Sequence, residues 1–262
     1  MACRSPTTPQ GAGGRTKPTY CWRETNVSGA IPDASKDPVS PPYGSLRVVE
    51  DVASAFAEVV LDAFAKRPDP RFVLVLSGGP TARRCYEKLA DLGVKTVDWA
   101  RVDVLMGDER CVGADHPDAN QRLVREALLE RVGPVGSFHP MSCENVGSYQ
   151  KMLEETPALD VVHLGLGPDG HTASLFAGSP ALDAPPGALV VRSSDPHERN
   201  PHERMTLTLD AIARARLVIF TVSGDSKRDA LGALEAGADL PAARVHATRV
   251  LWLADHLAAT GL

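Results

Sequence analysis

Hydrophobic residues follow two different spacings along the chain from Ser45 onward. Val49, Val52, Phe56 and Ala63 recur at helical intervals, which predicts an amphipathic helix at the start of this region. Short uninterrupted apolar runs predict buried strands, and these cover residues 71–76, 101–106, 160–166, 217–222 and 250–253. Helical patterns span residues 82–92 and 120–131, and a further helix is expected after residue 227.

This alternation of strands and helices predicts an α/β fold with three layers, Rossmann-like, in which a mostly parallel sheet carries helices on both faces. An alternating stretch at residues 205–209 is also strand-like, and Asp255 is expected to cap a short final helix. Polar loops follow four of the predicted strands. Because open α/β sheets bind ligands at the carboxyl ends of their strands, we expect the functional site there.

The first 44 residues differ from the rest of the chain. They are rich in Pro, Gly, Ser and Thr and have almost no periodic apolar pattern, so residues 1–44 are expected to form a disordered or loosely packed arm. They also lack the apolar core of a signal peptide. Residues 45–262 are long enough for one well-buried α/β domain.

Composition limits the possible partners. The formal net charge of −5 argues against a nucleic-acid or membrane surface, but it allows a local basic pocket for a small anion. Five scattered cysteines without a Cys-x-x-Cys pair suggest neither a disulfide framework nor a zinc knuckle, so a reducing, cytoplasmic setting fits best. Cys111 lies beside charged residues, but no partner histidine is evident and we assign it no chemistry.

The loop that follows the strand at 160–166 carries the most specific chemistry. Gly167 and Gly170 allow tight turns. Asp169 lies between these two glycines, and His171 directly follows the second one. A carboxylate two residues from an imidazole can orient it as a general base. Thr172 would then begin the next helix. The alternative is an ordinary turn with a capping Asp and a solvent-facing His.

Three other strand ends carry groups suited to an anion. A glycine turn at the start of a helix exposes backbone amides to an anion, and hydroxyl and cationic side chains add further donors. The residues concerned are Ser77, Gly78, Gly79 and Thr81 in the first loop, Asp108, Glu109 and Arg110 in the second, and Lys227 in the third. Each loop alone is also compatible with a solvated turn. The glycine turn is neither a Rossmann fingerprint nor a P-loop, so a nucleotide site has no support.

A near-repeat of five residues precedes the stretch at 205–209. Pro-His-Glu-Arg occurs at 196–199 and again at 201–204, too short for a repeat architecture. Arg204 leads directly into the strand-like stretch, so it is better placed than Arg199 to face a pocket. His163 lies inside an apolar strand and is interpreted as structural.

Together these loops resemble one family, the 6-phosphogluconolactonases, within a wider group that includes glucosamine-6-phosphate deaminases. The resemblance covers the chain from about residue 45 to its end, and the residues that carry it are 76–81, 107–110, 118–120, 165–176, Arg204, Gly224 and Lys227. Deaminases have an acidic residue soon after the Asp-Gly-His. Here Ala173, Ser174, Leu175 and Phe176 follow His171, so lactone hydrolysis is the better match and residues 45–262 would form the catalytic domain.

The resemblance implies hydrolysis of 6-phospho-D-glucono-1,5-lactone to 6-phosphogluconate in the oxidative pentose phosphate pathway, with no cofactor and no metal. His171 would activate water and Asp169 would hold its tautomer. The implied substrate-binding residues are Ser77, Gly78, Gly79, Thr81, Asp108, Arg110, Arg204 and Lys227. Arg110 fits either end of the substrate, and Asp108 and Glu109 would position Arg110 or bind sugar hydroxyls.

Two other functions stay open at this point, and the partner expected in each case is a small phosphorylated sugar. A deaminase or isomerase on the same scaffold would release ammonia from glucosamine 6-phosphate or interconvert sugar phosphates. A non-catalytic sensor would bind sugar phosphates without turnover, but the retention of Asp169 and His171 argues against it. We favour a monomer.

Overall fold

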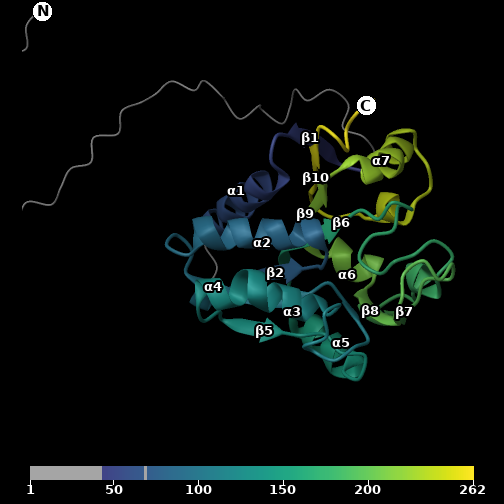
Figure 1. The fold of residues 1–262 in the computed structure, drawn as a ribbon. Helices are drawn as coiled ribbons and strands as arrows, with labels where there is room; N and C mark the ends of the chain where they lie inside the picture. Colours follow the sequence, from purple (N-terminus) through teal and green to yellow (C-terminus); the bar gives the residue numbers. More distant parts are fainter. Residues whose placement is uncertain (1–42, 68–69) are drawn as a thin grey trace, which may run out of the picture. The chain divides into compact units, whose positions relative to one another are not determined.

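A computed structural model describes residues 43–67 and 70–262, and Figure 1 shows its fold. The strands are β1 (Ser45–Val49), β2 (Phe72–Leu76), β3 (Val102–Met106), β4 (Asp108–Arg110), β5 (Ser137–His139), β6 (Leu159–Gly165), β7 (Val190–Ser193), β8 (Arg204–Leu207), β9 (Ala215–Val222) and β10 (Val250–Asp255). The α-helices are α1 (Val52–Ala65), α2 (Pro80–Gly93), α3 (Asn120–Val124), α4 (Glu130–Val132), α5 (Val146–Glu155), α6 (Leu209–Ala213) and α7 (Arg228–Glu235). A π-helical turn, Arg125–Leu129, joins α3 to α4 in one continuous helical segment.

Seven strands form a parallel sheet in the order β1-β10-β9-β6-β2-β3-β5. The chain crosses this sheet outward from β1 through β2 and β3 to β5, and it returns through β6 and β9 to β10. Because crossover connections are right-handed, the outward path places α1, α2 and the α3–α4 segment on one face and the return path places α5, α6 and α7 on the other. Figure 1 shows the first group side by side along the sheet. The predicted three-layer α/β fold is confirmed.

The direction of travel reverses between β2 and β6, which are neighbours in the sheet. At such a switch point the connections leave toward opposite faces, and a crevice forms between the two strand ends. Every residue of β2 and the first six residues of β6 are buried. These near-continuous apolar runs are typical of parallel strands covered on both faces, which explains why the sequence pattern located them well.

The sheet interior reaches back to the first described residues. Phe220 and Trp252 stack with their ring centroids 3.7 Å apart, and Tyr43 packs edge-on against Trp252 at 5.7 Å. Trp252 Nε1 donates a hydrogen bond to the Tyr43 carbonyl at 3.0 Å. Gly44 has a φ of +116°, and a Cβ there would lie 2.5 Å from the Val250 carbonyl oxygen. Tyr43 and Gly44 therefore pack against the sheet, whereas residues 1–42 of the predicted arm lie outside the described residues. The division into an arm and one domain stays a prediction.

A second, antiparallel sheet of three strands in the order β4-β8-β7 was not predicted. Residues 108–110, interpreted as a turn, form β4 and pair with β8, so that Arg110 lies opposite Arg204. The short length of β4 explains the error, because three residues show no alternation. This pairing brings the end of β3 next to the arginine that follows the near-repeat.

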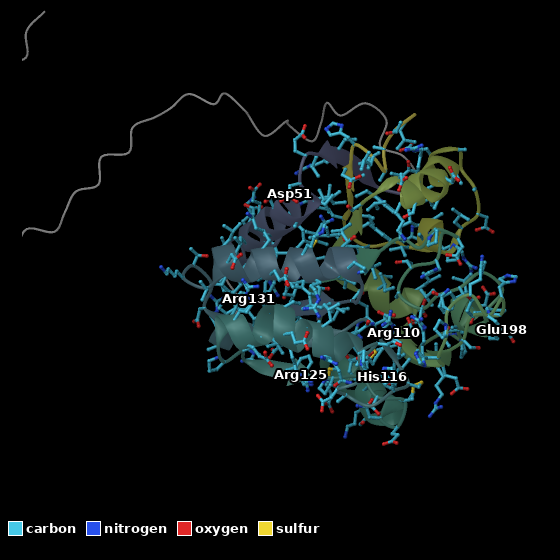
Figure 2. All side chains as sticks on the ribbon, viewed as in Figure 1. Asp51, Arg110, His116, Arg125, Arg131 and Glu198 are labelled. Atoms are coloured by element: carbon cyan, nitrogen blue, oxygen red, sulfur yellow. A yellow bond between two sulfur atoms is a disulfide. The ribbon has the colours of Figure 1, made fainter. Side chains whose placement is uncertain are left out.

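Three other local predictions were wrong. Residues 45–49 form the edge strand β1, and the helix begins only after Asp51, whose carboxylate caps it by accepting from the amides of Ala53 and Ser54 (Asp51 is labelled in Figure 2). Turns, and no helix, follow Asp255, whose carboxylate accepts from Ser223 Oγ at 2.7 Å. Thr172 begins no helix either.

Among the described residues, no helix is both long and apolar enough to cross a membrane.

Candidate active site

A cavity of about 320 Å³ opens at the carboxyl ends of β2, β3, β6 and β9. Its lining includes most of the residues predicted for the site, namely Ser77, Gly78, Gly79, Thr81, Asp108, Arg110, His171, Arg204 and Lys227. Asp169 stands directly behind His171. The structure thus brings together groups from the segments after β2, β6 and β9 and from two strands of the small sheet, β4 and β8, at the switch point of the fold.

The loop after β6 holds a carboxylate–imidazole pair. Asp169 Oδ1 lies 2.5 Å from His171 Nδ1, and both side chains are largely buried. Burial opposes the charge of Asp169, but the adjacent His171 outweighs it and lowers the pKa of that carboxyl below its usual value. Gly167 is required here, because a Cβ on it would lie 2.2 Å from His171 Nδ1. With Nδ1 bound to the carboxylate, Nε2 is the ring nitrogen left for a group in the cavity.

The turn after His171 is tight and not helical. Thr172 Oγ1 donates back to the Gly165 carbonyl at 2.9 Å, and Ala173 adopts a positive φ of 47°. A β-bridge between Thr172 and Leu175 then closes the turn. These contacts fix the backbone directly after His171, which corrects the prediction that Thr172 starts a helix.

Arg199 completes the surroundings of the carboxylate. Its Nη2 lies 2.9 Å from Asp169 Oδ2, the oxygen that His171 does not use. The segment that carries Arg199 wraps around Asp195, whose carboxylate accepts hydrogen bonds from the amides of His197, Arg199 and Asn200. Asn200 itself lines the cavity. The first copy of the near-repeat therefore contacts Asp169, and the second copy supplies Arg204 to the cavity.

The glycine turn after β2 stands at the N-terminus of α2. Gly79 is the N-cap residue with a φ of +106°, no side chain caps this end, and the space over its α-carbon is open. A Cβ at Gly78 would lie 1.7 Å from Asn120 Oδ1, so a larger residue here would displace the buried Asn120 side chain. Free amides at a helix start attract an anion. The prediction of an anion-binding turn is thus consistent with the geometry.

Ser77 is tied into the protein more tightly than predicted. Its hydroxyl donates to the His163 carbonyl at 2.8 Å and its amide donates to Tyr86 Oη at 2.8 Å. Tyr86 Oη also lies 2.8 Å from His163 Nδ1, and His163 Nε2 lies 2.8 Å from Thr221 Oγ1. Burial lowers the pKa of His163 to about 3, so this ring is neutral. His163 has the structural role that was predicted, although its ring extends to the cavity wall.

The acidic residues after β3 organise the backbone around them. Glu109, 1% exposed, accepts from the amides of Asn120 and Gln121, each at 2.7 Å, and burial raises its pKa. Asp108 accepts from Ser174 Oγ at 2.7 Å and from Asn120 Nδ2 at 3.2 Å. The Arg110 guanidinium donates to the carbonyl of Asp118 instead. The expectation that these acids position the Arg110 side chain is therefore not supported by the contacts of the described residues.

Two cations approach the cavity from other directions. Arg204 is 5% exposed, its Nη1 lies 3.5 Å from Ser174 Oγ, and its Cζ lies 5.6 Å from the ring centre of Phe176. Burial lowers the pKa of Arg204 and that of Lys227, and the charge of Asp169 opposes the shift at Lys227. Lys227 ends a 3₁₀ turn, Asp225–Lys227, that follows Gly224. Figure 2 shows Arg110, from the same cavity, beside the small sheet.

Several residues of the site were missed from sequence. They are Asn120 and Ser174, which carried the family resemblance but were given no role, Asn200 and Thr221, which line the cavity, and Arg199, which was considered only as a phosphate ligand. Asn120 was within reach of sequence reasoning, because it begins a helix directly after a polar loop. The others depend on pairings across the fold that a linear pattern does not record.

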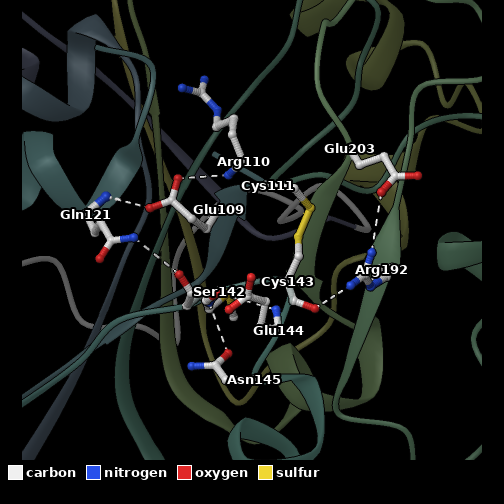
Figure 3. The surroundings of a disulfide bond; sticks show 11 residues. Glu109, Arg110, Cys111, Gln121, Ser142, Cys143, Glu144, Asn145, Arg192 and Glu203 are labelled. Carbon is white, nitrogen blue, oxygen red and sulfur yellow. Dashed lines mark hydrogen bonds and ion pairs between the residues drawn. A yellow bond between two sulfur atoms is a disulfide. The ribbon is translucent and has the colours of Figure 1, made fainter. Parts of the chain in front are cut away.

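A disulfide joins Cys111 to Cys143 beside the site, which contradicts the expectation drawn from the cysteine pattern (Figure 3). Cys111 directly follows Arg110, and Cys143 lies in the loop between β5 and α5. Their α-carbons are 5.4 Å apart, within the range that a disulfide spans. The 32-residue separation hid the pair, because sequence alone does not show that the two loops meet. The predicted cytoplasmic setting stays untested.

Comparison with known proteins agrees with the site. Residues 45–252 match the family model of glucosamine-6-phosphate isomerases/6-phosphogluconolactonase. A 6-phosphogluconolactonase of Synechocystis sp. is 39% identical over 178 residues, which cover 62% of this chain and 71% of the relative. The 6-phosphogluconolactonase of Mycobacterium leprae is 34% identical over 237 residues, which cover 82% of this chain and 94% of the relative. The chain therefore belongs to the family of glucosamine-6-phosphate isomerases and 6-phosphogluconolactonases.

Within this family, its relatives place the chain among the 6-phosphogluconolactonases, which are lactone hydrolases, as the residues after His171 predicted. The crystal structure of 6-phosphogluconolactonase from Leishmania guyanensis superposes with a TM-score of 0.74 at 26% identity, covering 84% of this chain and 98% of that one. The crystal structure of 6-phosphogluconolactonase from Thermotoga maritima superposes with a TM-score of 0.71 at 28% identity, covering 80% of this chain and 98% of that one. A monomeric glucosamine-6-phosphate deaminase, at 18% identity and 0.69, shares the fold.

Reduction of the Cys111–Cys143 bond is expected to lower the free energy of unfolding by about 3–4 kcal/mol, because a closed loop of this length restricts the unfolded chain. Urea denaturation with and without a thiol reductant measures it. The Cys111→Ser, Cys143→Ser double variant serves as the control, since it should unfold like the reduced parent and respond to reductant no further. Equal midpoints for the oxidised and reduced parent would refute the prediction.

Proposed function

We propose that the chain hydrolyses 6-phospho-D-glucono-1,5-lactone to 6-phosphogluconate through water activated by His171, without a metal. The observation that carries the proposal is the 2.5 Å contact between Asp169 Oδ1 and His171 Nδ1 at the wall of a cavity that is also lined by three cationic side chains and a helix N-terminus. A base, an anion-binding end and room for a sugar-sized ligand are the requirements of this reaction.

In the proposed reaction, His171 Nε2 accepts a proton from water as the water oxygen attacks the lactone carbonyl carbon. The carbonyl oxygen becomes an oxyanion in the tetrahedral intermediate. Collapse of the intermediate breaks the bond to the ring oxygen, which takes the proton from His171 and becomes a hydroxyl. Asp169 keeps the proton on Nδ1 throughout and stabilises the imidazolium.

The phosphate group is proposed to lie against the start of α2. The amides around Gly79 are uncapped there, and Lys227 and Arg204 line the same cavity. In the described part of the chain, Arg110 Nε and Arg204 Nε are buried without a hydrogen-bond partner, so neither guanidinium has all of its donors satisfied by the protein. Both donors of Ser77 are already engaged, so its share in ligand binding is confined to shaping the turn.

Arg199 is proposed to fix the second oxygen of Asp169. A carboxylate held at both oxygens presents one orientation to His171, whereas a carboxylate held at one oxygen rotates more freely. Three groups of opposite charge act on the Asp169 carboxylate: Arg199, Lys227 and, when it is protonated, His171. Arg199 is 48% exposed, so its contribution is moderated by solvent.

For His171→Ala, we expect kcat for lactone opening to fall by about 10²–10⁴-fold, because general-base catalysis is lost. The assay follows acid release from the phosphorylated lactone against its spontaneous opening. Addition of EDTA to the parent should leave its rate unchanged. A variant as active as the parent would remove His171 from the mechanism, and inhibition by EDTA would overturn the metal-free step.

For Lys227→Ala, we expect the KM for the phosphorylated lactone to rise by about tenfold or more, because a charge-assisted contact to the phosphate is lost. Arg204→Ala should act in the same direction. The matched control is the unphosphorylated lactone, whose kcat/KM should change little in either variant. Equal losses with both substrates would show that these cations do not bind the phosphate.

For Arg199→Gln, we expect kcat to fall by about fivefold with little change in KM, since a half-exposed ion pair contributes up to ~1 kcal/mol. Loss of this cation leaves the carboxylate with less compensating charge, so the Asp169–His171 pair should take up a proton at a higher pH and activity should decline at a higher pH on the acid side than in the parent. Arg199→Lys should restore part of the rate. Arg192→Gln, which removes a similarly exposed guanidinium, is the control, and a pH profile identical to that of the parent would reject the role of Arg199.

A further inference from the structure

A second cavity, of about 380 Å³, lies at the amino ends of the strands, whereas the active site lies at their carboxyl ends. It is formed where the last turns of α1 pass over the first residues of β2, β6, β9 and β10 and over β1. Strand β9 touches both cavities: Arg216 near its start lines the second, and Thr221 near its end lines the first. At ~3.3 Å per residue, the two sites are roughly 16 Å apart along this strand.

The charges around the second cavity are strongly biased. Its described lining contains five cations, Arg47, Lys66, Arg67, Arg216 and Arg249, and two acids, Asp62 and Asp160. This excess of three positive charges occurs in a chain whose formal net charge is −5. A hollow lined by one sign of charge concentrates ions of the other sign, so the cavity attracts anions against the overall charge of the molecule.

Asp160 anchors the centre of this arrangement. It is 5% exposed, and its Oδ2 accepts from the Val73 amide at 2.8 Å. Its Oδ1 lies 2.6 Å from Arg67 Nε and 3.3 Å from Arg216 Nε. One carboxylate thus contacts two guanidinium groups at the cavity. The Arg216 side chain is 53% exposed, so its guanidinium remains open to solvent at the cavity.

The rim has further cations that no acid in the described region neutralises. Arg47 and Arg249 are exposed, and neither has an ion pair with a described carboxylate, whereas Lys66 pairs with Asp62 at 2.8 Å. The wall between the charged groups is apolar and consists of Val59, Ala63, Phe72, Leu217 and Leu251. A cationic rim over an apolar wall suits a ligand that carries several negative charges on a compact group.

We propose that this second cavity is a binding site for a compact anion with two linked phosphate groups, held by Arg47, Arg216 and Arg249. Two phosphates match the excess of three positive charges better than one does, and guanidinium groups bind phosphate oxygens in pairs. The site lies apart from the catalytic loops and does not depend on the proposed reaction. Inorganic diphosphate and the diphosphate end of a nucleotide share this chemistry.

The test is calorimetric titration of pyrophosphate, and separately of ADP, into the full chain and into the Arg47→Gln, Arg249→Gln double variant. Both positions are exposed, so the fold and the lactone hydrolysis rate should be unchanged. We expect binding of pyrophosphate to weaken at least tenfold in the variant. Tighter binding of ADP than of pyrophosphate, lost in the same variant, would assign the site to a nucleotide, and equal binding would assign it to diphosphate itself.

The matched control is the Arg125→Gln, Lys151→Gln double variant, which removes the same charge from one partly exposed and one exposed position, neither of which lines a cavity. It should bind pyrophosphate as the parent does. Unchanged binding in the Arg47→Gln, Arg249→Gln variant, or an equal loss in the control, would overturn the proposal, because the anion would then bind at the active site or respond only to net charge.

Discussion

The adjacency of β2 and β6 is the constraint on which the site depends. The chain leaves these two strands toward opposite faces of the sheet, so the glycine turn after β2 and the Asp-x-His loop after β6 face each other across a crevice. Neither loop makes a site alone. Their relative position is set by buried hydrophobic strands that contain none of the predicted catalytic groups, and this separates the stability of the scaffold from the chemistry of its loops.

Below the cavity, a hydrogen-bonded chain connects three elements that the topology brings together. Tyr86 from α2 is hydrogen-bonded to His163 from β6, and His163 is hydrogen-bonded to Thr221 from β9. The Tyr86 hydroxyl also bonds to the backbone of Ser77. Because His163 is neutral and fully buried, the network carries no net charge beneath a site proposed to bind an anion. It braces the glycine turn against β6, so the two facing loops are coupled mechanically as well as by topology.

Much of this arrangement could be predicted from the sequence, and the limits have physical causes. Buried parallel strands such as β2 and β6 appear as apolar runs, and Asp169 and His171 could be paired because they are neighbours in one loop. The strand β4 is too short to show a period. The Cys111–Cys143 bond and the Arg199–Asp169 ion pair join residues that are far apart in the chain, and their contacts exist only once the small sheet has formed.

The near-repeat at 196–204 has a consequence for how such a site can diverge. Its two arginines, five positions apart, occupy different places: Arg199 stands on the carboxylate behind the imidazole, and Arg204 stands in the cavity wall. A loop between β7 and β8 that lost one copy would keep the wall arginine, which is fixed by its strand, and lose the one on the carboxylate. Length variation in a surface loop can therefore adjust the proposed catalytic pair while leaving the proposed substrate contacts in place, an evolutionary route that would alter rate separately from affinity.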